Sequence, residues 1–389
     1  TTRAAFVSTN SITQGEQVGA LWGPLLAKGI KIHFAHRTFR WNNEARGVAA
    51  VHCVIVGFAD FDVSKKRLFN YADERSEPEE VIVNNLNPYL VDGPDVVIRS
   101  RSKPLCVVPE IGIGNKPIDG GNYLFTDEEK AEFIKLEPGS EKYFKRWLGS
   151  DEFINGWQRW CLWLGDAAPG ELRQFPEVLK RIDAVRRVRL ASVSAPTRKI
   201  ADTPTRFHVE NMPRKEYLII PEVSSERRTF IPIGFETPNT LASNLVKILP
   251  DASLYHFGML SCTMHNAWMR NVCGRMKSDY RYSKDIVYNN YPWPEQPTAA
   301  QKATVEKAAQ GVLDARAQFP KASLADLYDP LTMPPALLKA HHALDKAVDK
   351  CYRPQPFTTD AKRVEFLFEL YEKYVGGLLV ESGKGKKRK

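Results

Sequence analysis

Hydrophobic patterning between residues 4 and 58 constrains the fold of this chain more than any other feature. The apolar runs at 4–8 and 49–58 are typical of strands, and KIHFA at 31–35 predicts another strand between them. Helical spacing of apolar residues over 14–29 predicts a helix that a glycine ends. A strand-helix-strand-strand order cannot bury its own faces as a separate domain. We therefore expect the end of an α/β sheet here, cut from a larger protein.

Two polar stretches accompany this pattern. HRTFRWNNEARG, residues 36–47, predicts a long loop that carries Phe39 and Trp41. DERSEPEE, residues 73–80, is dense in charge and predicts a surface connection to the next region.

From about residue 88 to 295 the pattern changes to short strands and turns mixed with helices. We expect strands at 90–98, 216–223 and 228–235, and helices at 149–164 and 176–192. The second helix is basic, with Arg181, Arg186, Arg187 and Arg189 mostly opposite its apolar side. Between residues 180 and 206, eight Lys or Arg stand against two Asp, a local charge of 8 − 2 = +6. This patch could track phosphates.

The last part of the chain predicts three helices, at 298–319, 334–352 and 360–379, with Asp360 placed to cap the third. The net charge of the chain is +9, of which the terminal GKGKKRK carries five, leaving 9 − 5 = +4. We expect this basic end to be disordered. Net charge is therefore weak evidence for a polyanionic partner, and the location of the charge matters more.

Several classes of protein are disfavoured by missing motifs. The six cysteines stand far apart without a CxxC pair, which predicts buried thiols of a cytosolic protein. His33 and His36 would point to opposite faces, which argues against a metal site. There is no GxSxG nucleophile signature, and GIGN at 112–115 lacks the third glycine of a dinucleotide loop. No apolar run approaches the 18 or so residues of a membrane span.

A row of charged residues stands in GRMKSDYRYS, residues 274–283. Lys277, Asp279 and Arg281 occupy every second position. In an extended chain these side chains would project together, about 6.5 Å apart at roughly 3.3 Å per residue. Such a row suits a base-pair ladder, but an ordinary solvated strand or loop edge with a Lys–Asp pair explains the same pattern.

Six long blocks of the sequence resemble, in order, one family of proteins. The blocks are FVSTNSITQGEQV, IHFAHRTFRWNNEARGVAAVHCVIVGF, NPYLVDGPDVV, LIIPEVSSERRTFIPIGF, MHNAWMRNVCGRMKSDYRYS and IVYNNYPWP. They resemble the carboxy-terminal half of MmeI-like enzymes. These bacterial proteins fuse an adenine-N6 DNA methyltransferase, a target-recognition domain and a helical end region, often with a nuclease upstream. The resemblance covers nearly the whole chain.

The resemblance implies a fold class of α/β and α+β. Residues 1–75 would hold the last three strands of a class I, Rossmann-like methyltransferase sheet, and residues 76–297 a mixed α+β target-recognition domain. A helical C-terminal domain at 298–383 and a basic disordered tail at 384–389 would follow.

The same resemblance implies that the chain is a fragment. The family's S-adenosylmethionine-binding FxGxG block and catalytic NPPY or NPPF block should precede these strands, and neither occurs; NPYL at 87–90 has one proline and lies downstream. S-adenosylmethionine is thus the implied cofactor of the intact parent protein. For this fragment we expect no cofactor, metal or catalytic residue and no activity by itself. Its implied partners are double-stranded DNA and the missing amino-terminal half of the same polypeptide, in the bacterial cytoplasm and without a membrane.

Phe39 lies where related adenine methyltransferases carry an aromatic that stacks on the flipped base. An extruded adenine loses its stacking partners, and an aromatic face replaces them. Trp41 could fill this role instead, and Phe39 could also fold back on the sheet.

The resemblance also points to base-reading positions in the middle region. The matching residues are Glu222, Asn244, Leu245, Lys277, Asp279 and Arg281. Lys and Arg donate to guanine, Asp accepts from cytosine and Asn pairs with adenine. We hypothesise that Lys277 and Asp279 read one G·C pair and that Arg281 reads a pair about two steps away. Leu245 would limit which purine Arg281 meets.

Two other readings remain open. One is a stand-alone, non-enzymatic DNA specificity subunit, which would have no need for half a methyltransferase sheet. The other is a small-molecule enzyme, for which no nucleophile–base or metal constellation emerges.

Overall fold

The first region of the molecule is a five-stranded sheet with one helix. The computed structural model describes residues 2–41, 51–71 and 76–384. The strands are β1 (Arg3–Thr9), β2 (Lys31–Trp41), β3 (Val51–Ala59), β4 (Lys66–Tyr71) and β5 (Pro78–Val83), in the order β1-β3-β2-β4-β5. Helix α1 (Glu16–Ala27) buries Val18 and Trp22 completely, and the Trp22 indole donates to the Ile12 carbonyl at 2.8 Å. The predicted strand-helix-strand-strand order is thus confirmed, and the sheet continues beyond it.

Two predictions for this region are wrong. Strand β2 runs to Trp41, so Phe39 and Trp41 lie on a strand that pairs with β3 and not in a loop. Residues 42–50, the rest of the expected loop, are outside the described residues. The expected surface connection ends in strand β5, which pairs antiparallel with β4. Its charges do not prevent pairing, because Arg67 and Glu80 form a cross-strand ion pair at 2.7 Å and a charged edge strand is protected from further pairing.

Three small sheets form the middle region. One is β12-β10-β14-β6, with β6 (Gly112–Ile113), β10 (Tyr217–Pro221), β12 (Gly234–Glu236) and β14 (Val246–Pro250). A second is β13-β8-β9-β7, with β7 (Leu124–Phe125), β8 (Phe144–Leu148), β9 (Trp160–Leu162) and β13 (Thr240–Ala242). The third, β11-β16-β15, contains β11 (Val223–Ser224), β15 (Gly274–Met276) and β16 (Asp279–Arg281).

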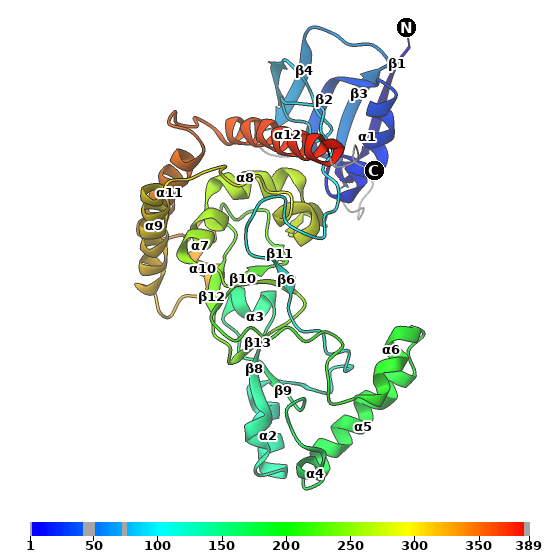
Figure 1. Cartoon of the computed structure of the whole chain (residues 1–389), viewed down its shortest axis with the longest axis vertical. Helices are drawn as coiled ribbons and strands as arrows, with labels where there is room; N and C mark the ends of the chain where they lie inside the picture. Colours follow the sequence, from blue (N-terminus) through cyan, green and yellow to red (C-terminus); the bar gives the residue numbers. More distant parts are fainter. Residues whose placement is uncertain (1, 42–50, 72–75, 385–389) are drawn as a thin grey trace.

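The middle region also contains helices, two of which, α5 (Pro176–Leu190) and α6 (Ala195–Lys199), extend away from these sheets (Figure 1). The other α-helices are α2 (Asp127–Leu136), α3 (Ser150–Asn155), α4 (Pro169–Leu172), α7 (Leu254–Ser261) and α8 (Thr263–Val272). Shorter helical turns in the same region are η2 (Ser140–Tyr143), η3 (Ile200–Asp202) and the π-helical η4 (Lys284–Tyr288), whereas η1 (Asn10–Thr13) belongs to the first region. The predicted basic helix at 176–192 is confirmed as α5.

Three expected elements of the middle region are wrong or shortened. Residues 90–98 form no strand because their amides bond to side chains: Val91 N–H to Asn87 and Ile98 N–H to the Tyr89 hydroxyl at 2.9 Å. The helix expected over 149–164 ends at Asn155, where Gly156 adopts φ 73°, and the chain continues as β9.

In the segment 228–235, only the end is a strand. Pro232 has no amide hydrogen, and the Ile231 amide donates to the Asn266 side chain at 3.0 Å. Pairing therefore begins at Gly234.

The end of the chain forms the three predicted helices, α9 (Ala299–Ala317), α11 (Pro335–Tyr352) and α12 (Asp360–Lys384), with the short α10 (Leu324–Leu327) between the first two. Asp360 is the first residue of α12 and not its cap. Instead, the Thr359 hydroxyl accepts from the Lys362 amide at 3.2 Å, as an N-cap side chain does.

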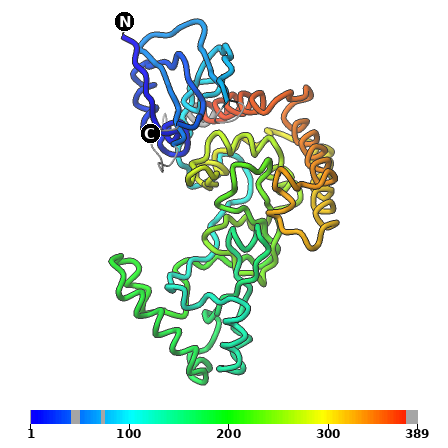
Figure 2. The backbone as a smooth tube through the Cα atoms, turned by 180° about the vertical axis from the view of Figure 1, so that it is seen from behind, coloured from blue at the N-terminus to red at the C-terminus, as the bar shows by residue number. Residues whose placement is uncertain are grey.

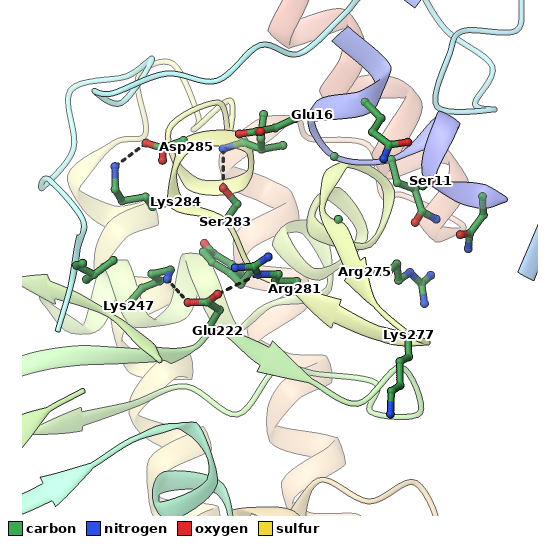
Figure 3. Close-up of a pocket in the computed structure, with 18 residues that line it drawn as sticks. Ser11, Glu16, Glu222, Lys247, Arg275, Lys277, Arg281, Ser283, Lys284 and Asp285 are labelled. Atoms are coloured by element: carbon green, nitrogen blue, oxygen red, sulfur yellow. Dashed lines mark hydrogen bonds and ion pairs between the residues drawn. The ribbon is translucent and has the colours of Figure 1, made fainter. Parts of the chain in front are cut away.

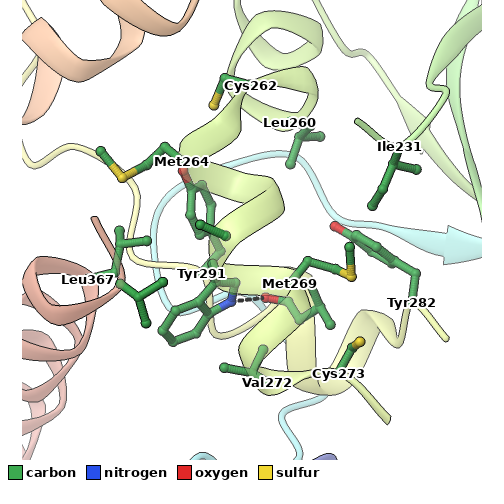
Figure 4. Close-up of a cluster of buried hydrophobic side chains, with 14 of the residues drawn as sticks. Ile231, Leu260, Cys262, Met264, Met269, Val272, Cys273, Tyr282, Tyr291 and Leu367 are labelled. Atoms are coloured by element: carbon green, nitrogen blue, oxygen red, sulfur yellow. Dashed lines mark hydrogen bonds between the residues drawn. The ribbon is translucent and has the colours of Figure 1, made fainter. Parts of the chain in front are cut away.

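One continuous core joins the first sheet, the middle region and the end helices. Trp268 of α8 is fully buried at its centre, and its indole donates to the Val287 carbonyl at 3.0 Å. Figure 4 shows this part of the core, with Met264, Met269 and Val272 of α8 labelled. The Trp268 ring lies 5.5 Å from the ring of Phe368, which belongs to α12. A second core, which contains Phe125, Trp163 and Val185, lies beneath α5.

The whole molecule is curved. Figures 1 and 2 show the first sheet with α1 at one end, the middle sheets in the centre and the α5–α6 arm at the other end, with α9 and α11 along the outer side. Helix α12 returns from the outer side to lie beside the first sheet (Figure 1). Within the described residues, we find no helix with the length and apolar character needed to cross a membrane.

Candidate functional site

The charged row at 274–283 folds into a tight hairpin. Strands β15 and β16 pair Met276 with Asp279, which leaves Lys277 and Ser278 as the two-residue turn. Lys277 has φ 59°, because a two-residue hairpin turn of this kind needs a residue with positive φ. The expectation of one extended segment is therefore wrong for Lys277, which stands at the hairpin tip. Asp279 and Arg281 do share a face of β16, since strand side chains alternate.

Glu222 connects this hairpin to the neighbouring sheet. It lies between β10 and β11, and its carboxylate accepts from Lys247 Nζ at 2.5 Å and from Arg281 Nε at 2.9 Å. Its backbone is also held on both sides: the Glu222 amide donates to the Leu245 carbonyl at 3.1 Å, and the Tyr282 amide donates to the Glu222 carbonyl at 2.7 Å. The Lys247 and Glu222 side chains are only 7% and 13% exposed, whereas that of Arg281 is 56% exposed.

These contacts fix the charge of Glu222. Burial by itself raises the pKa of the Glu222 carboxyl, but the hydrogen bonds and charges of Lys247 and Arg281 together bring this pKa below its ordinary value. Glu222 is therefore ionised at neutral pH, and Arg281 is held by a charge-assisted hydrogen bond.

A cleft of about 630 Å³ separates the hairpin from the start of α1, and Glu222, Lys247, Lys277 and Arg281 line it (Figure 3). Gly15, at the other wall, donates from its amide to the Val272 carbonyl at 3.1 Å. With φ 61° and the backbone of Gly274 3.2 Å from where a Cβ would stand, position 15 suits only glycine.

The walls of this cleft carry more positive than negative charge. The cations are Lys247, Arg275, Lys277, Arg281 and Lys284, and the carboxylates are Glu16, Glu222 and Asp285, a balance of 5 − 3 = +2. The cleft thus favours an anionic ligand.

Asn244 and Leu245 lie in the loop between β13 and β14. The Asn244 amide donates to the Asn115 carbonyl at 2.8 Å, and the Leu245 carbonyl accepts from Ser150 Oγ at 2.5 Å as well as from Glu222. The Leu245 side chain is 56% exposed, and both residues line a second cleft of about 350 Å³. The backbone therefore joins Leu245 to Glu222, while its side chain belongs to a neighbouring cleft.

The structure thus brings some of the predicted residues together and separates others. Glu222 and Arg281 are in contact, and Lys277 lies on the same cleft. Asp279 is half-buried, and its carboxylate is an electrostatic partner of the Arg228 guanidinium.

Sequence reasoning missed two residues of this site. Lys247 is a nearly buried cation in the otherwise apolar strand β14. Because a buried lysine without a charged partner is rare, a lysine in such an apolar strand indicates a buried acidic partner. Arg275 lies 4.1 Å over the Tyr280 ring and donates to the Ser278 carbonyl at 2.7 Å, so it supports the turn.

Phe39 belongs to a separate aromatic cluster on the first sheet. Its ring lies 5.4 Å from the Tyr71 ring, nearly parallel to it, and 6.2 Å from the Trp41 ring. The Tyr71 hydroxyl is 2.8 Å from His36 Nδ1, and His36 stacks on Phe69 at 4.2 Å. Trp41 is 50% exposed. Among the described residues, no group of His, Cys, Asp and Glu is arranged to hold a metal ion.

Comparison with known proteins places these features in one family. Three family models match consecutive parts of the chain: the MmeI DNA-methyltransferase domain over residues 1–70, the MmeI target recognition domain over 92–295 and the MmeI C-terminal domain over 297–379. A curated relative, DNA methyltransferase A of Bacillus subtilis (strain 168), is 41% identical over 370 residues, which are 95% of this chain and 41% of that protein.

A solved structure is also similar. The structure of the Type IIL restriction-modification enzyme MmeI in complex with DNA matches with a TM-score of 0.90 and 54% identity, over 96% of this chain and 50% of that chain. The chain therefore spans half or less of the length of these two relatives.

The sheet and the middle domain put the chain in the class of proteins that join a DNA-methyltransferase domain, here matched over residues 1–70, to a target recognition domain. Within that class, the chain belongs to the MmeI family, whose target recognition domain matches residues 92–295, more than half of its length. The predicted fold class is confirmed: part of a methyltransferase sheet, a mixed α+β recognition domain and a helical C-terminal domain.

Proposed function

We propose that the recognition domain, which we predict to span residues 76–297, binds a specific sequence of duplex DNA. The observation that carries this proposal is the hydrogen-bonded ion pair between Glu222 and Arg281. An exposed guanidinium is oriented by a nearly buried carboxylate, at the mouth of a cationic cleft that also holds Lys277. Because the relative MmeI was solved in complex with DNA, the anionic ligand of this cleft is most simply a nucleic acid.

The hydrogen bonds around Arg281 suit a guanine contact. Glu222 occupies Nε of Arg281, which leaves the two terminal nitrogens free to donate to O6 and N7 of guanine. Both carboxylate oxygens of Glu222 are bonded, one to Arg281 and the other to Lys247. We therefore propose that Glu222 mainly orients Arg281. Asn244 and Leu245, which line the neighbouring cleft, would contact the DNA beside Arg281.

Lys277 and Asp279 are proposed to read one G·C pair. Lys277 lies in the hairpin turn and Asp279 is the first residue after it, so a donor and an acceptor stand close together, although not along one extended strand. Asp279 and Arg281 are about 6.5 Å apart along one face, or about two base-pair steps. Arg281 would then read a pair two positions from the pair of Lys277 and Asp279.

Substitution of Arg281 tests the proposal. We expect Arg281→Ala to lose about 1–3 kcal/mol of discrimination at a single base-pair position, while discrimination at the other positions remains. The measurement is a competition between duplexes that differ at one position, for wild type and variant. Equal loss of affinity for every duplex would contradict a base-reading role and leave Arg281 a backbone contact.

For the intact protein, we propose adenine-N6 DNA methylation with S-adenosylmethionine as cofactor, in the bacterial cytoplasm. The support is the similarity to DNA methyltransferase A and to the MmeI methyltransferase domain. The FxGxG and NPPY or NPPF blocks do not occur in this chain, so we expect the chain alone to transfer no methyl group and to need the missing half of the same polypeptide. Methyl transfer from labelled cofactor to DNA by the purified chain would contradict this.

We further propose that Phe39 stacks on the extruded adenine. Tyr71 backs one side of the Phe39 ring, and the exposed Trp41 stands nearby. In the intact protein, Phe39→Ala should lower turnover and base extrusion, measured with 2-aminopurine at the target base. Unchanged turnover and extrusion would remove Phe39 from the mechanism.

A further inference from the structure

Helices α5 and α6 form an arm that stands away from the central sheets (Figures 1 and 2). The inner side of α5 packs on the second core through Val178 and Val185, which are both fully buried. At about 1.5 Å per residue, the 15 residues of α5 make a rod about 22 Å long. This length equals about six base-pair steps of 3.4 Å.

Arg189 fixes the arm to the body. Its side chain is fully buried, and its three nitrogens donate to the carbonyls of Pro117, Ile118, Ile200, Thr203 and Arg206 at 2.7–3.0 Å. An arginine has five N–H donors, so all of them are used. The prediction that Arg189 belongs to an exposed basic side is therefore wrong: it is an internal clamp that holds the arm in one orientation.

The remaining cations of the arm are exposed, except Arg181, which is half-buried with its guanidinium 4.9 Å from the centre of the Phe125 ring. Without Arg189, the arm (residues 176–199) holds six Lys or Arg against one Glu and one Asp, a charge of 6 − 2 = +4. Lys180 pairs with Glu177 and Arg187 with Asp183, both as exposed pairs within one helix. Arg186 and Lys199 are exposed and have no ion-pair partner in the part of the chain that the structure describes.

The arm and the β15–β16 hairpin lie on the same side of the curved molecule. The hairpin pairs with β11 and lines a cleft with the start of α1, at the inner side of the curve, and both views place the arm across the opening from α1 (Figures 1 and 2). A duplex that meets the hairpin would extend towards the arm.

We propose that the α5–α6 arm binds the phosphate backbone of the duplex whose bases the hairpin reads. This inference rests on the proposed function, and it adds a second contact surface to it. A rigid arm with a charge of +4 and unpaired cations complements a polyanion, and phosphate contacts fix the register of a protein on DNA without reading its sequence. The arm would thus supply affinity, and the hairpin specificity.

The test is the salt dependence of binding by the full chain. Each phosphate contact contributes about 0.9 to the slope of log K against log salt. For the double variant Arg186→Gln and Lys199→Gln, we expect a slope less negative by about 1.8, and an equal loss of affinity for duplexes with and without the recognised site. Thermal unfolding of the variant, whose substituted side chains are exposed, should match wild type.

The matched control removes two exposed lysines elsewhere, Lys307→Gln on α9 and Lys339→Gln on α11, at the outer side of the molecule (Figure 1). We expect its slope to equal that of wild type. A wild-type chain that binds duplex DNA, with the same slope for the arm variant, would overturn the arm proposal alone. A wild-type chain without salt-dependent binding to any duplex would overturn the proposed function, and the arm proposal with it.

Discussion

At the scale of residues, the account rests on one ion network of Lys247, Glu222 and Arg281. Lys247 and Glu222 come from neighbouring strands, and their nearly buried charges neutralise each other. A buried charge left without its partner is costly, whereas a pair replaced by apolar groups is often tolerated. The network can therefore be tested through stability, independently of DNA.

We expect Glu222→Gln to destabilise the fold by roughly 1–3 kcal/mol, because Lys247 loses a charged acceptor in a nearly buried site. The double variant Glu222→Gln with Lys247→Met should recover much of this loss, since it removes the orphaned charge. Urea unfolding of the wild type, both single variants and the double variant measures the coupling. Additive effects of the two substitutions would contradict it.

The pH dependence of the same network has a defined sign. The pKa of Glu222 is lower in the folded chain than its ordinary value of 4.5, so its contribution to stability is fully present above about pH 4.5 and is lost as the pH falls through the folded pKa. The difference in unfolding free energy between wild type and Glu222→Gln should be constant from pH 8 to about 6 and shrink below pH 4.5. A difference that grows on acidification would contradict the ion network.

The family resemblance pointed to residues that line the cleft, but not to their arrangement in space. Glu222 and Arg281 were selected from the sequence, but not their contact, because 59 positions separate them along the chain. Arg189 and Arg186 belong to the same arginine-rich run. Only the contacts of Arg189 with the carbonyls of residues 117–118 and 200–206 distinguish this internal clamp from a surface charge such as Arg186.

At the scale of elements, the hairpin β15–β16 matters most for the proposed function, because it carries Lys277, Asp279 and Arg281. Its turn places Lys277 at positive φ, which is unfavourable for a residue with a Cβ. Lysine at this position costs turn stability, which agrees with the DNA contact that we propose for it. The local sequence contains no Asn-Gly or Asp-Gly pair to announce the turn, which explains why an extended segment was expected.

The positive φ of Lys277 allows its effect on folding to be measured separately from its effect on DNA binding. Glycine accepts positive φ without strain, so Lys277→Gly should leave the fold equally or slightly more stable. The same variant should bind its DNA site about 5- to 150-fold more weakly, the range of one base contact. Thermal unfolding and duplex binding measure the two effects. Binding equal to wild type would exclude Lys277 from the interface.

Other elements show where local patterns mislead. Amphipathic spacing located α1, α5, α9 and α11 correctly, because each buries one apolar stripe. The run 149–164 has the same apolar density, but Gly156 divides it into a short helix and a strand that pairs with β8. Strand β5 was missed because its charged residues look like a linker until the pairing with β4 is known.

At the scale of the whole molecule, one core connects the methyltransferase sheet to the recognition domain. Helix α8 contributes Trp268 to that core, and α12 packs against it from the C-terminal domain. The hairpin follows α8 directly, so its position relative to the first sheet is fixed by the core and by the Gly15 contact with Val272. If the intact protein methylates DNA as we propose, such a rigid connection would set a constant distance between the bases that are read and the base that is methylated.

The measurement that tests the central claim most directly is selection of bound duplexes from a random-sequence library by the purified chain. The account predicts enrichment of one short sequence that contains G·C pairs at two positions about two steps apart, with the preference at one of them lost for Arg281→Ala. Recovery of duplexes without any common sequence, at low and at moderate salt, would contradict specific recognition by this chain.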